Sequence, residues 1–397
     1  MSIGTAFHDR TAALNRKLQW REWSGYYAAS VYADSWDIEY NAIREAAALI
    51  DVSPLFKYEV SGPDAVRLVD RVIVRDATKL QVGQVYYTCW CDEDGKVVDD
   101  GTITRLDEQT FRWTAADPQL RWFRMNAGWL DVDVVETTER TAALALQGPL
   151  SRAVLERASG QSFADLRYFR GRPARIGGID LYVTRTGYTG DLGYELWAQA
   201  EEAVALWDAL MEGGGGYGAR PAGMLALDVA RLEAGLILLE VDYTSSRHAM
   251  IPEQSYSPFE IGLGRLVKLD KPADFVGKRA LIREQEAGGP ARRLVGLEVD
   301  WAQFEAMYVS RGLPPSVPGA TWRTAVPVYS PARQVGRATS GTWSPILKKN
   351  VALASLQATV ATPGTRLQIE WTVEVHRGRL AATVVELPFL DLPRKRA

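Results

Sequence analysis

The residue types most able to bind a small molecule gather in one stretch, residues 185–196. It reads RTGYTGDLGYEL, in which three glycines and two tyrosines precede the carboxylate of Glu195. Glycines allow the backbone to turn tightly and to approach a flat ligand closely. The alternating apolar residues on either side predict two strands, so the stretch can simply be the loop of a hairpin. The alternative is that Glu195 and Tyr188 form the wall of a small-molecule pocket.

Two further polar features lie in apolar surroundings. Asp99 and Asp100 follow a predicted hairpin turn at Asp94 and Gly95, and side chains alternate along a strand, so one of the two must face the interior. A buried carboxylate is costly unless it is paired, and a structural salt bridge is therefore one interpretation beside a functional role. Arg231 lies in an apolar segment with helical spacing, where a buried arginine requires a carboxylate or a ligand.

The motifs of several common enzyme classes are missing. The sequence contains no G-x-S-x-G, no H-E-x-x-H and no dinucleotide fingerprint. An enzyme without these motifs would have to act by positioning two ligands and by stabilising the charge that develops between them. Residues 242–248 are a polar segment that is either a solvated connection or a lid that selects the substrate.

Composition limits the function classes. The chain has 397 residues, a formal net charge of −3 and no apolar run near the roughly 20 residues of a membrane helix. It offers no basic surface for nucleic acid and no membrane anchor. The polar N-terminus lacks the apolar region of a signal peptide, so we expect a cytoplasmic protein. Two cysteines build no disulfide framework, and three scattered histidines predict no metal site.

Several of the 13 tryptophans and 16 tyrosines lie near the N-terminus. Aromatic residues mostly fill cores, but a cluster flanked by Arg, Asp and Ser can also line a cage for a cation or an aromatic ring. Trp20, Trp23 and Tyr26 are therefore candidates for substrate binding.

The chain repeats a unit made of a strand, a Gly-Pro pair and a helix. Residues 60–66 read VSGPDAV and residues 146–152 read LQGPLSR. A second helix follows each unit, near residues 117–128 and 200–211. The pattern predicts two duplicated α+β modules with a ligand pocket at their seam, and chance similarity is the alternative.

The remaining segments set the outline of the fold. Residues 1–40 predict an irregular aromatic arm, and residues 39–50 predict a short helix. Beyond a linker at residues 286–290, short strands separated by turn residues predict a barrel or sandwich of about a hundred residues.

Four motifs, in this order, resemble those of the folate-dependent aminomethyltransferase family. That family includes the glycine cleavage T-protein, the dimethylsulfoniopropionate demethylase and aromatic O-demethylases. The motifs are QGP at residues 147–149, RTGYTGDLGYE at 185–195, ARLEAGL at 230–236 and TSGTWSPILKKNVA at 339–352.

The resemblance implies an α+β fold with three domains around a central tetrahydrofolate site. Two related α+β lobes would surround the folate, and a small β-barrel would follow. We expect residues 1–285 to form the folate-binding region, with 51–140 in one lobe and 1–50 together with 141–285 in the other. Residues 291–390 would form the C-terminal barrel.

The resemblance also implies roles for individual residues. Glu195 corresponds to the glutamate that grips the pterin, whose two-donor edge suits a bidentate carboxylate. Tyr188 would lie against the folate, and Asp100 aligns with the functional aspartate beside the reactive nitrogens. Arg231 aligns with an arginine of the folate site, or it acts structurally by bracing the loop.

The sequence differs from the T-protein pattern at positions that bear on the identity of the substrate. The chain carries an insertion after Asp242, and Arg265 stands where a tryptophan is common. These differences favour a demethylase that moves a methyl group from a small-molecule donor to N5 of tetrahydrofolate. The donor would be a sulfonium, a quaternary ammonium or a methoxyarene. Asp100 would stabilise charge at the attacking nitrogen, and Tyr243 would bind the substrate and protonate a phenolate leaving group.

Two alternatives stay open. The first is the T-protein reaction itself, an aminomethyl transfer with a lipoyl carrier protein as partner. The second is a folate-binding module without catalysis. In each case we expect no nucleic-acid or membrane partner.

Overall fold

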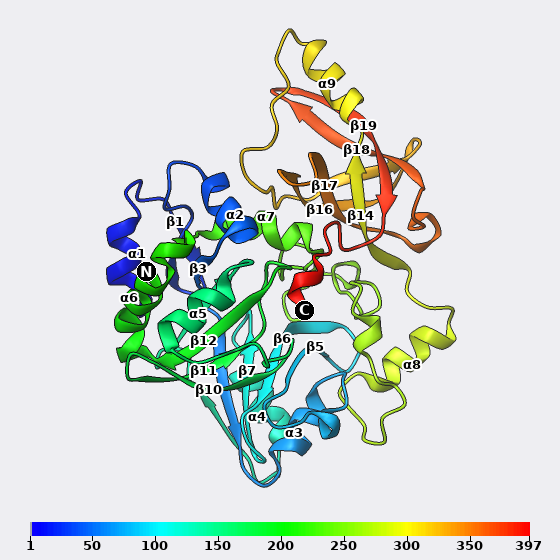
Figure 1. Cartoon of the computed structure of the whole chain (residues 1–397). Coiled ribbons are helices and arrows are strands. Elements are labelled where there is room, and N and C mark those ends of the chain that lie inside the picture. Colours follow the sequence, from blue (N-terminus) through cyan, green and yellow to red (C-terminus); the bar gives the residue numbers. More distant parts are fainter. Residues whose placement is uncertain (1) are drawn as a thin grey trace. The chain divides into compact units, whose positions relative to one another are not determined.

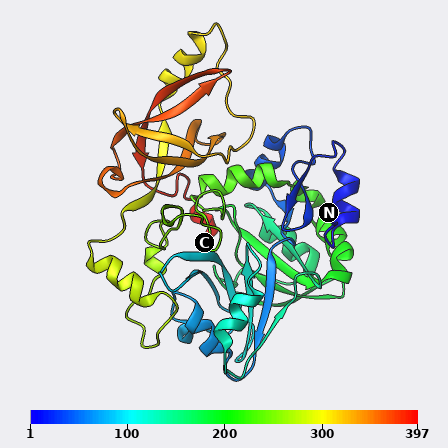
Figure 2. The ribbon, with the colours of Figure 1, turned by 180° about the vertical axis from the view of Figure 1, so that it is seen from behind.

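The computed structural model describes residues 2–397, which divide into two compact units (Figures 1 and 2). Unit 1 extends to Thr88 and also includes Asp99–Ala230 and Leu392–Ala397, whereas unit 2 comprises Cys89–Val98 and Arg231–Asp391. Within the described chain, every helix is too short or too polar to cross a lipid bilayer.

A six-stranded sheet forms one part of unit 1. Its strands lie in the order β10, β11, β12, β9, β3, β13, and the neighbours are antiparallel except β3 and β13. In that order the strands span Gly171–Ile176, Ile179–Thr184, Gly193–Gln199, Thr141–Gln147, Ala48–Asp51 and Arg220–Pro221.

Both faces of the central strand β9 are buried. Leu144 and Leu146 of β9 pack in one core with helices α5 (Ser151–Ser159) and α6 (Ala203–Gly214). Their neighbours Ala143 and Ala145 belong to a second core on the opposite face. Because apolar side chains are needed on both sides, β9 reads as a continuous apolar run.

A five-stranded sheet has the order β5, β6, β7, β4, β8. Its strands span Val85–Cys91, Val97–Arg105, Thr110–Ala115, Phe56–Ser61 and Asp133–Glu136, and helices α3 and α4 span Ala65–Val72 and Leu120–Ala127. Trp113 of β7 stacks on Phe123 of α4 with ring centroids 4.1 Å apart, and Tyr58 of β4 meets the same ring edge-on at 5.2 Å. Aromatic packing thus fixes α4 against this sheet.

The two Gly-Pro segments share their backbone geometry. Gly62 after β4 has φ +129° and Gly148 after β9 has φ +124°, a region that favours glycine. A Cβ on Gly148 would lie 2.6 Å from the Ala46 carbonyl oxygen, and one on Gly62 would lie 2.8 Å from the Asp131 carbonyl oxygen. The same turn therefore requires glycine in both copies of the repeat, which supports the predicted duplication.

The N-terminal segment is more regular than predicted. It contains helix α1, the hairpin β1–β2 and helix α2, which span His8–Leu14, Trp20–Trp23, Tyr26–Ala29 and Trp36–Glu45. The prediction of an irregular arm is therefore wrong. The helix predicted over residues 39–50 is wrong in its second part, because Ala48–Asp51 form strand β3. A short apolar run fits a buried strand as well as a helix, and its periodicity cannot separate the two.

Unit 2 contains a closed six-stranded barrel, drawn from yellow to red in Figure 1. The strand order is β14, β17, β16, β15, β18, β19, and the barrel closes because β14 pairs with both β17 and β19. In that order the strands span Arg292–Val299, Lys349–Gln357, Arg333–Ser344, Val326–Ser330, Arg366–Val373 and His376–Val385. Alternate residues Val295, Leu297 and Val299 fill its core together with Phe304 of α9 (Trp301–Val309).

The α+β fold with a C-terminal β-barrel is thereby confirmed. Helix α8 (Lys278–Glu286) precedes the barrel, and helix α7 (Met224–Glu233) spans the boundary between the units. The assignment of residues 51–140 and of residues 1–50 with 141–285 to two separate lobes stays a prediction.

Candidate functional site

The glycine-rich stretch connects β11 and β12 as a hairpin loop. The two strands are antiparallel, with Tyr182 opposite Trp197 and Thr184 opposite Glu195. The hairpin interpretation is therefore correct, and Glu195 lies at the start of β12 where the loop re-enters the sheet. Tyr188 is half-buried and packs against the core that contains Ala143 and Ala145 of β9.

The amide of Gln147 holds this loop from the neighbouring strand. Its Nε2 donates to the carbonyl oxygens of Thr186 and Tyr194 at 3.2 and 3.3 Å, and its Oε1 accepts from the Thr189 hydroxyl at 2.8 Å. A Cβ at Gly187 or Gly193 would lie 2.0 or 2.3 Å from this amide. Two of the three glycines are thus explained by the close approach of Gln147, not by a ligand.

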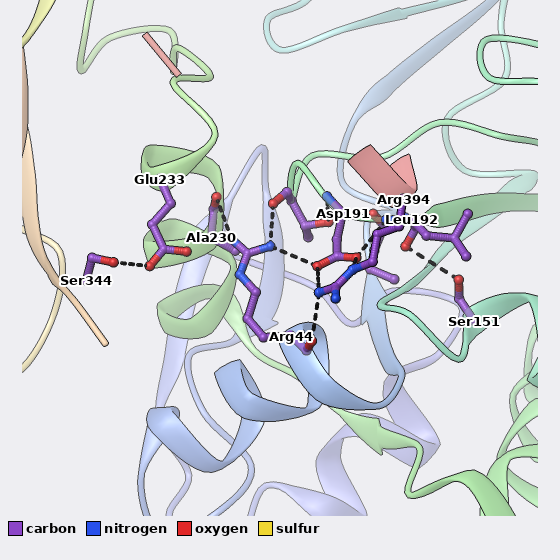
Figure 3. A network of polar contacts seen from close by, with 10 residues as sticks. Arg44, Ser151, Asp191, Leu192, Ala230, Glu233, Ser344 and Arg394 are labelled. Atoms are coloured by element: carbon purple, nitrogen blue, oxygen red, sulfur yellow. Dashed lines mark hydrogen bonds and ion pairs between the residues drawn. The ribbon is translucent and has the colours of Figure 1, made fainter. Parts of the chain in front are cut away.

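The carboxylate of Asp191 ties the loop to two arginines (Figure 3). Arg394 forms a bidentate pair with it, with contacts of 2.7 and 2.8 Å, and Arg44 lies 3.3 Å away. Arg44 also donates to the carbonyl oxygens of Thr189 and Ala230 at 2.9 and 3.2 Å. Because the Asp191 side chain is fully buried, this pairing fixes the loop conformation.

Glu195 offers one carboxylate oxygen to a ligand. Its Oε2 accepts a 2.5 Å hydrogen bond from the Thr186 hydroxyl, and Oε1 has no hydrogen-bond partner among residues 2–397. Burial raises the pKa of this carboxyl above its usual range, and the Thr186 hydrogen bond opposes the shift. A ligand with two adjacent N–H donors would meet the acceptor capacity of the ionised group.

The two aspartates of β6 have different environments. Asp99 is fully buried and accepts from the backbone N–H groups of Ala116 and Asp117 at 3.1 and 3.0 Å, so backbone amides and not a salt bridge satisfy it. Burial, followed by the charge of Asp100, raises the pKa of Asp99 well above its usual value. Asp100 is half-buried and accepts a 2.7 Å hydrogen bond from the Tyr87 hydroxyl.

The faces that carry Asp100 and Glu195 meet in unit 1. The guanidinium carbon of Arg112 lies 5.5 Å from the ring centroid of Tyr182 and 5.1 Å from that of Trp197, so β7 packs against β11 and β12. Strand alternation places Glu195 on the same face as Trp197.

The same rule applies to the other sheet. Thr104 is opposite Arg112, and the hydroxyls of Thr102 and Thr114 are 2.8 Å apart, so this face includes Arg112, Thr102 and, two residues earlier, Asp100. Strand alternation therefore places both residues on the faces that meet at the seam between the two sheets, the place where the duplication predicts a ligand.

Arg231 faces a carboxylate within its own unit. Its Nη1 lies 2.6 Å from Asp242 Oδ2, and both side chains are completely buried. Asp242 also accepts hydrogen bonds from the Leu238 backbone N–H at 2.9 Å and from the hydroxyls of Thr339 and Ser340, each at 2.6 Å. Both roles that the sequence left open for Arg231, folate binding and bracing of the loop, stay predictions.

Four further residues are predicted to bind the substrate. Tyr243 is 1 % exposed, so the segment after Asp242 is in part a buried one and not wholly a solvated connection. Trp20 packs on His8 with ring centroids 5.3 Å apart, and Trp23 packs against the core formed with α2. Tyr26 is half-buried opposite Trp23 in the β1–β2 hairpin. Substrate binding by these four residues stays a prediction.

Sequence reasoning missed four residues that organise these sites: Arg44, Arg112, Arg394 and Asp242 as the partner of Arg231. Arg394 is 203 residues away from Asp191, and no local pattern could have linked them. Arg112 alternates with buried Phe111 and Trp113, which is the ordinary signature of a half-buried strand.

Comparison with known proteins gives consistent matches along the chain. Residues 5–271 match the family model described as the GCVT N-terminal domain, and residues 292–391 match that of the glycine cleavage T-protein C-terminal barrel domain. A solved structure, the glycine cleavage system aminomethyltransferase T from Bartonella henselae, aligns with a TM-score of 0.83 and 25 % identity over 98 % of this chain and 99 % of that one.

Two curated relatives differ in their printed activity. An aminomethyltransferase of Symbiobacterium thermophilum is 38 % identical over 90 % of both chains. A trimethylamine-oxide aldolase of Ruegeria pomeroyi is 37 % identical over 100 % of this chain, which spans 48 % of that relative's length. The chain thus spans about half of the longer relative and most of the other.

Proposed function

This chain belongs to the glycine cleavage T-protein family, whose members depend on tetrahydrofolate and transfer one-carbon units, and on that premise we propose that it is an aminomethyltransferase. The donor would carry its one-carbon unit on nitrogen, and the acceptor would be tetrahydrofolate. Both printed activities of the relatives concern a one-carbon unit attached to nitrogen. The comparisons support this reaction better than the demethylation that the sequence favoured.

The observation that carries the proposal is the pair of carboxylates in the seam of unit 1. Glu195 is half-buried beside Thr186 and keeps Oε1 for a ligand, which fits the two-donor edge of a pterin. Tyr188 would cover the folate ring from the same loop. Gln147 and Asp191 would hold that loop in place, so the anchor is preorganised before the ligand arrives.

Asp100 would act at the reacting end. When bound, tetrahydrofolate supplies the nitrogens that accept the one-carbon unit. The hydroxyl of Tyr87 donates to Asp100 Oδ2 and fixes the orientation of this carboxylate. The negative charge of Asp100 would stabilise positive charge that develops at the attacking nitrogen and at the departing amine. Arg231 would contribute at a distance, by bracing Asp242. Tyr243, buried beside Asp242, would serve as a proton donor only if the donor were a methoxyarene.

Turnover with an aminomethyl donor tests the proposal. Tetrahydrofolate is incubated with the chain and with an aminomethyl-loaded lipoyl carrier protein or a free aminomethyl compound, and methylenetetrahydrofolate is measured by mass spectrometry. We expect its formation with wild type and with Asp133→Asn, an exposed carboxylate on β8 that serves as a matched control. The absence of any one-carbon product with these donors would contradict the proposal.

Asp100→Asn separates an enzyme from a binding module. Removal of a preorganised charge at the reacting atoms typically lowers the rate by about 100- to 1,000-fold. We expect such a loss with tetrahydrofolate affinity changed far less. Equal losses of turnover and affinity would instead favour a module that only binds folate.

A further inference from the structure

A cavity of about 390 Å³ opens in unit 1 beside Arg112, and neither Asp100 nor Glu195 is part of its wall. Its wall includes Arg112, Tyr182 and Trp197. Further polar lining comes from Thr137, Thr141 and Gln199 and from the charged residues Glu59, Arg140 and Asp180. Trp197 and Tyr182 lie two residues from Glu195 and Thr184 on the same strands, so the cavity adjoins the seam.

Arg112 brings to this cavity a positive charge that forms no ion pair within residues 2–397. Its Nη1 is buried and has no hydrogen-bond partner, and no carboxylate among residues 2–397 forms an ion pair with its guanidinium. Glu59, opposite Arg112 on β4, is exposed, and its charge opposes the lowering of the Arg112 pKa without forming an ion pair with the guanidinium. Asp180 is also exposed and pairs with Arg175 at 3.0 Å. A buried arginine nitrogen without a partner is unusual in a folded protein, because the desolvated charge is expensive.

A second buried cation, Lys57, lies near Arg112 without lining the cavity. Lys57 of β4 is fully buried and donates to the carbonyl oxygens of Ser53 and Leu55 at 2.6 and 2.8 Å. Burial lowers the pKa of Lys57 to about 7 and that of Arg112 to about 10, and the positive charge of Arg112 further lowers the pKa of Lys57. An anion beside Arg112 would relieve both groups.

The shape and polarity of the wall define the ligand class. The planar guanidinium matches a carboxylate with two parallel hydrogen bonds, and the rings of Trp197 and Tyr182 offer apolar surface to the rest of the molecule. The lining hydroxyls of Thr137 and Thr141 suit polar groups at the edge. We propose that this cavity is a binding site for a small organic carboxylate, with Arg112 as its charge partner.

Two sources could supply that carboxylate: a separate small molecule, or the glutamyl end of a folate. The chemistry is the same, and the experiment separates the sources. The proposal does not rest on the proposed function, because binding can be measured without turnover.

The test is a calorimetric titration of the full chain with benzoate and with p-aminobenzoylglutamate, followed also by tryptophan fluorescence. We expect saturable binding of at least one probe by wild type. Arg112→Gln should weaken it by about 10- to 100-fold, because a hydrogen-bonded charge is lost. Arg112→Lys keeps the positive charge but lacks the planar guanidinium, and it should lose less probe affinity than Arg112→Gln. Arg121→Gln, an exposed arginine on α4, is the matched control and should bind as wild type does.

Tetrahydrofolate affinity of the same variants assigns the source. An equal loss of tetrahydrofolate and benzoate affinity in Arg112→Gln would support the site with the folate tail as ligand. Loss of benzoate affinity alone would support it with a separate carboxylate. The inference is overturned if wild type binds neither probe saturably, or if folded Arg112→Gln and Arg112→Lys bind as tightly as wild type.

Discussion

Removal of the Asp242 charge gives the sharpest test of how Arg231 acts. In Asp242→Asn the side chain keeps its size, but the guanidinium of Arg231 loses a fully buried partner at 2.6 Å. The new amide also presents N–H groups where Asp242 now accepts from Arg231, Thr339 and Ser340. We expect a large loss of stability in unit 2, because a buried charge is left without its counter-ion.

The size of the loss follows from the burial of the pair. Removal of one partner of a buried pair costs about 3–5 kcal/mol, whereas exposed pairs contribute about 0–1 kcal/mol. The partly exposed pair Lys349 and Glu298, also in unit 2, serves as the control. Glu298→Gln should therefore change the free energy of unfolding by less than about 1 kcal/mol.

Urea unfolding of each variant, followed by tryptophan fluorescence, measures these differences. The double variant Arg231→Met, Asp242→Leu should lose less than the sum of the single variants, because no buried charge is left unpaired. A wild-type unfolding midpoint for Asp242→Asn would refute the bracing role. If Arg231→Met kept wild-type stability but lost tetrahydrofolate affinity, Arg231 would be a direct ligand instead.

Three further predictions follow from single contacts. Burial holds the pKa of Lys57 near 7, against 10.5 for a free lysine, so the unfolded chain binds more protons between these values. The free energy of unfolding should therefore rise with pH from 7 to about 10, by up to roughly 1.4 kcal/mol per pH unit. Lys57→Met should flatten this slope. Parallel plots of unfolding free energy against pH for wild type and Lys57→Met would contradict the prediction. Gly148→Ala should destabilise by about 1–3 kcal/mol because its Cβ would meet the Ala46 carbonyl oxygen, while Gly216→Ala, in open space, should be near neutral in thermal unfolding. Arg394→Gln should remove the bidentate contact that Arg394 makes with Asp191 and so loosen the loop at residues 185–192. We expect faster proteolysis of that loop, and an unchanged cleavage rate would contradict the prediction.

Much of the fold is readable from local patterns. The Gly-Pro turns at Gly62 and Gly148 are visible because proline and glycine each restrict the backbone in a known way. The barrel is visible because short alternating strands with turn residues repeat at regular spacing. Ala48–Asp51 failed as a prediction because both faces of β3 are buried and its alternation is lost.

The candidate site is less readable, because its contacts join distant segments. Glu195 and Asp100 are recognisable from their motifs, but nothing local shows that their faces meet at one seam. The partner of Arg231 is another segment's carboxylate, and the partner of Asp191 lies near the C-terminus, at Arg394. Tertiary packing alone brings such pairs together, whatever their spacing along the chain.

The most direct test of the central claim is a competition in one reaction mixture. Wild-type chain and tetrahydrofolate are supplied with equal amounts of an aminomethyl donor and of a methyl donor, each with its own carbon isotope label, and the folate products are identified by mass spectrometry. An aminomethyltransferase is expected to yield methylenetetrahydrofolate carrying only the aminomethyl label. Accumulation of 5-methyltetrahydrofolate with the methyl donor's label would contradict the proposed function and restore the demethylase interpretation.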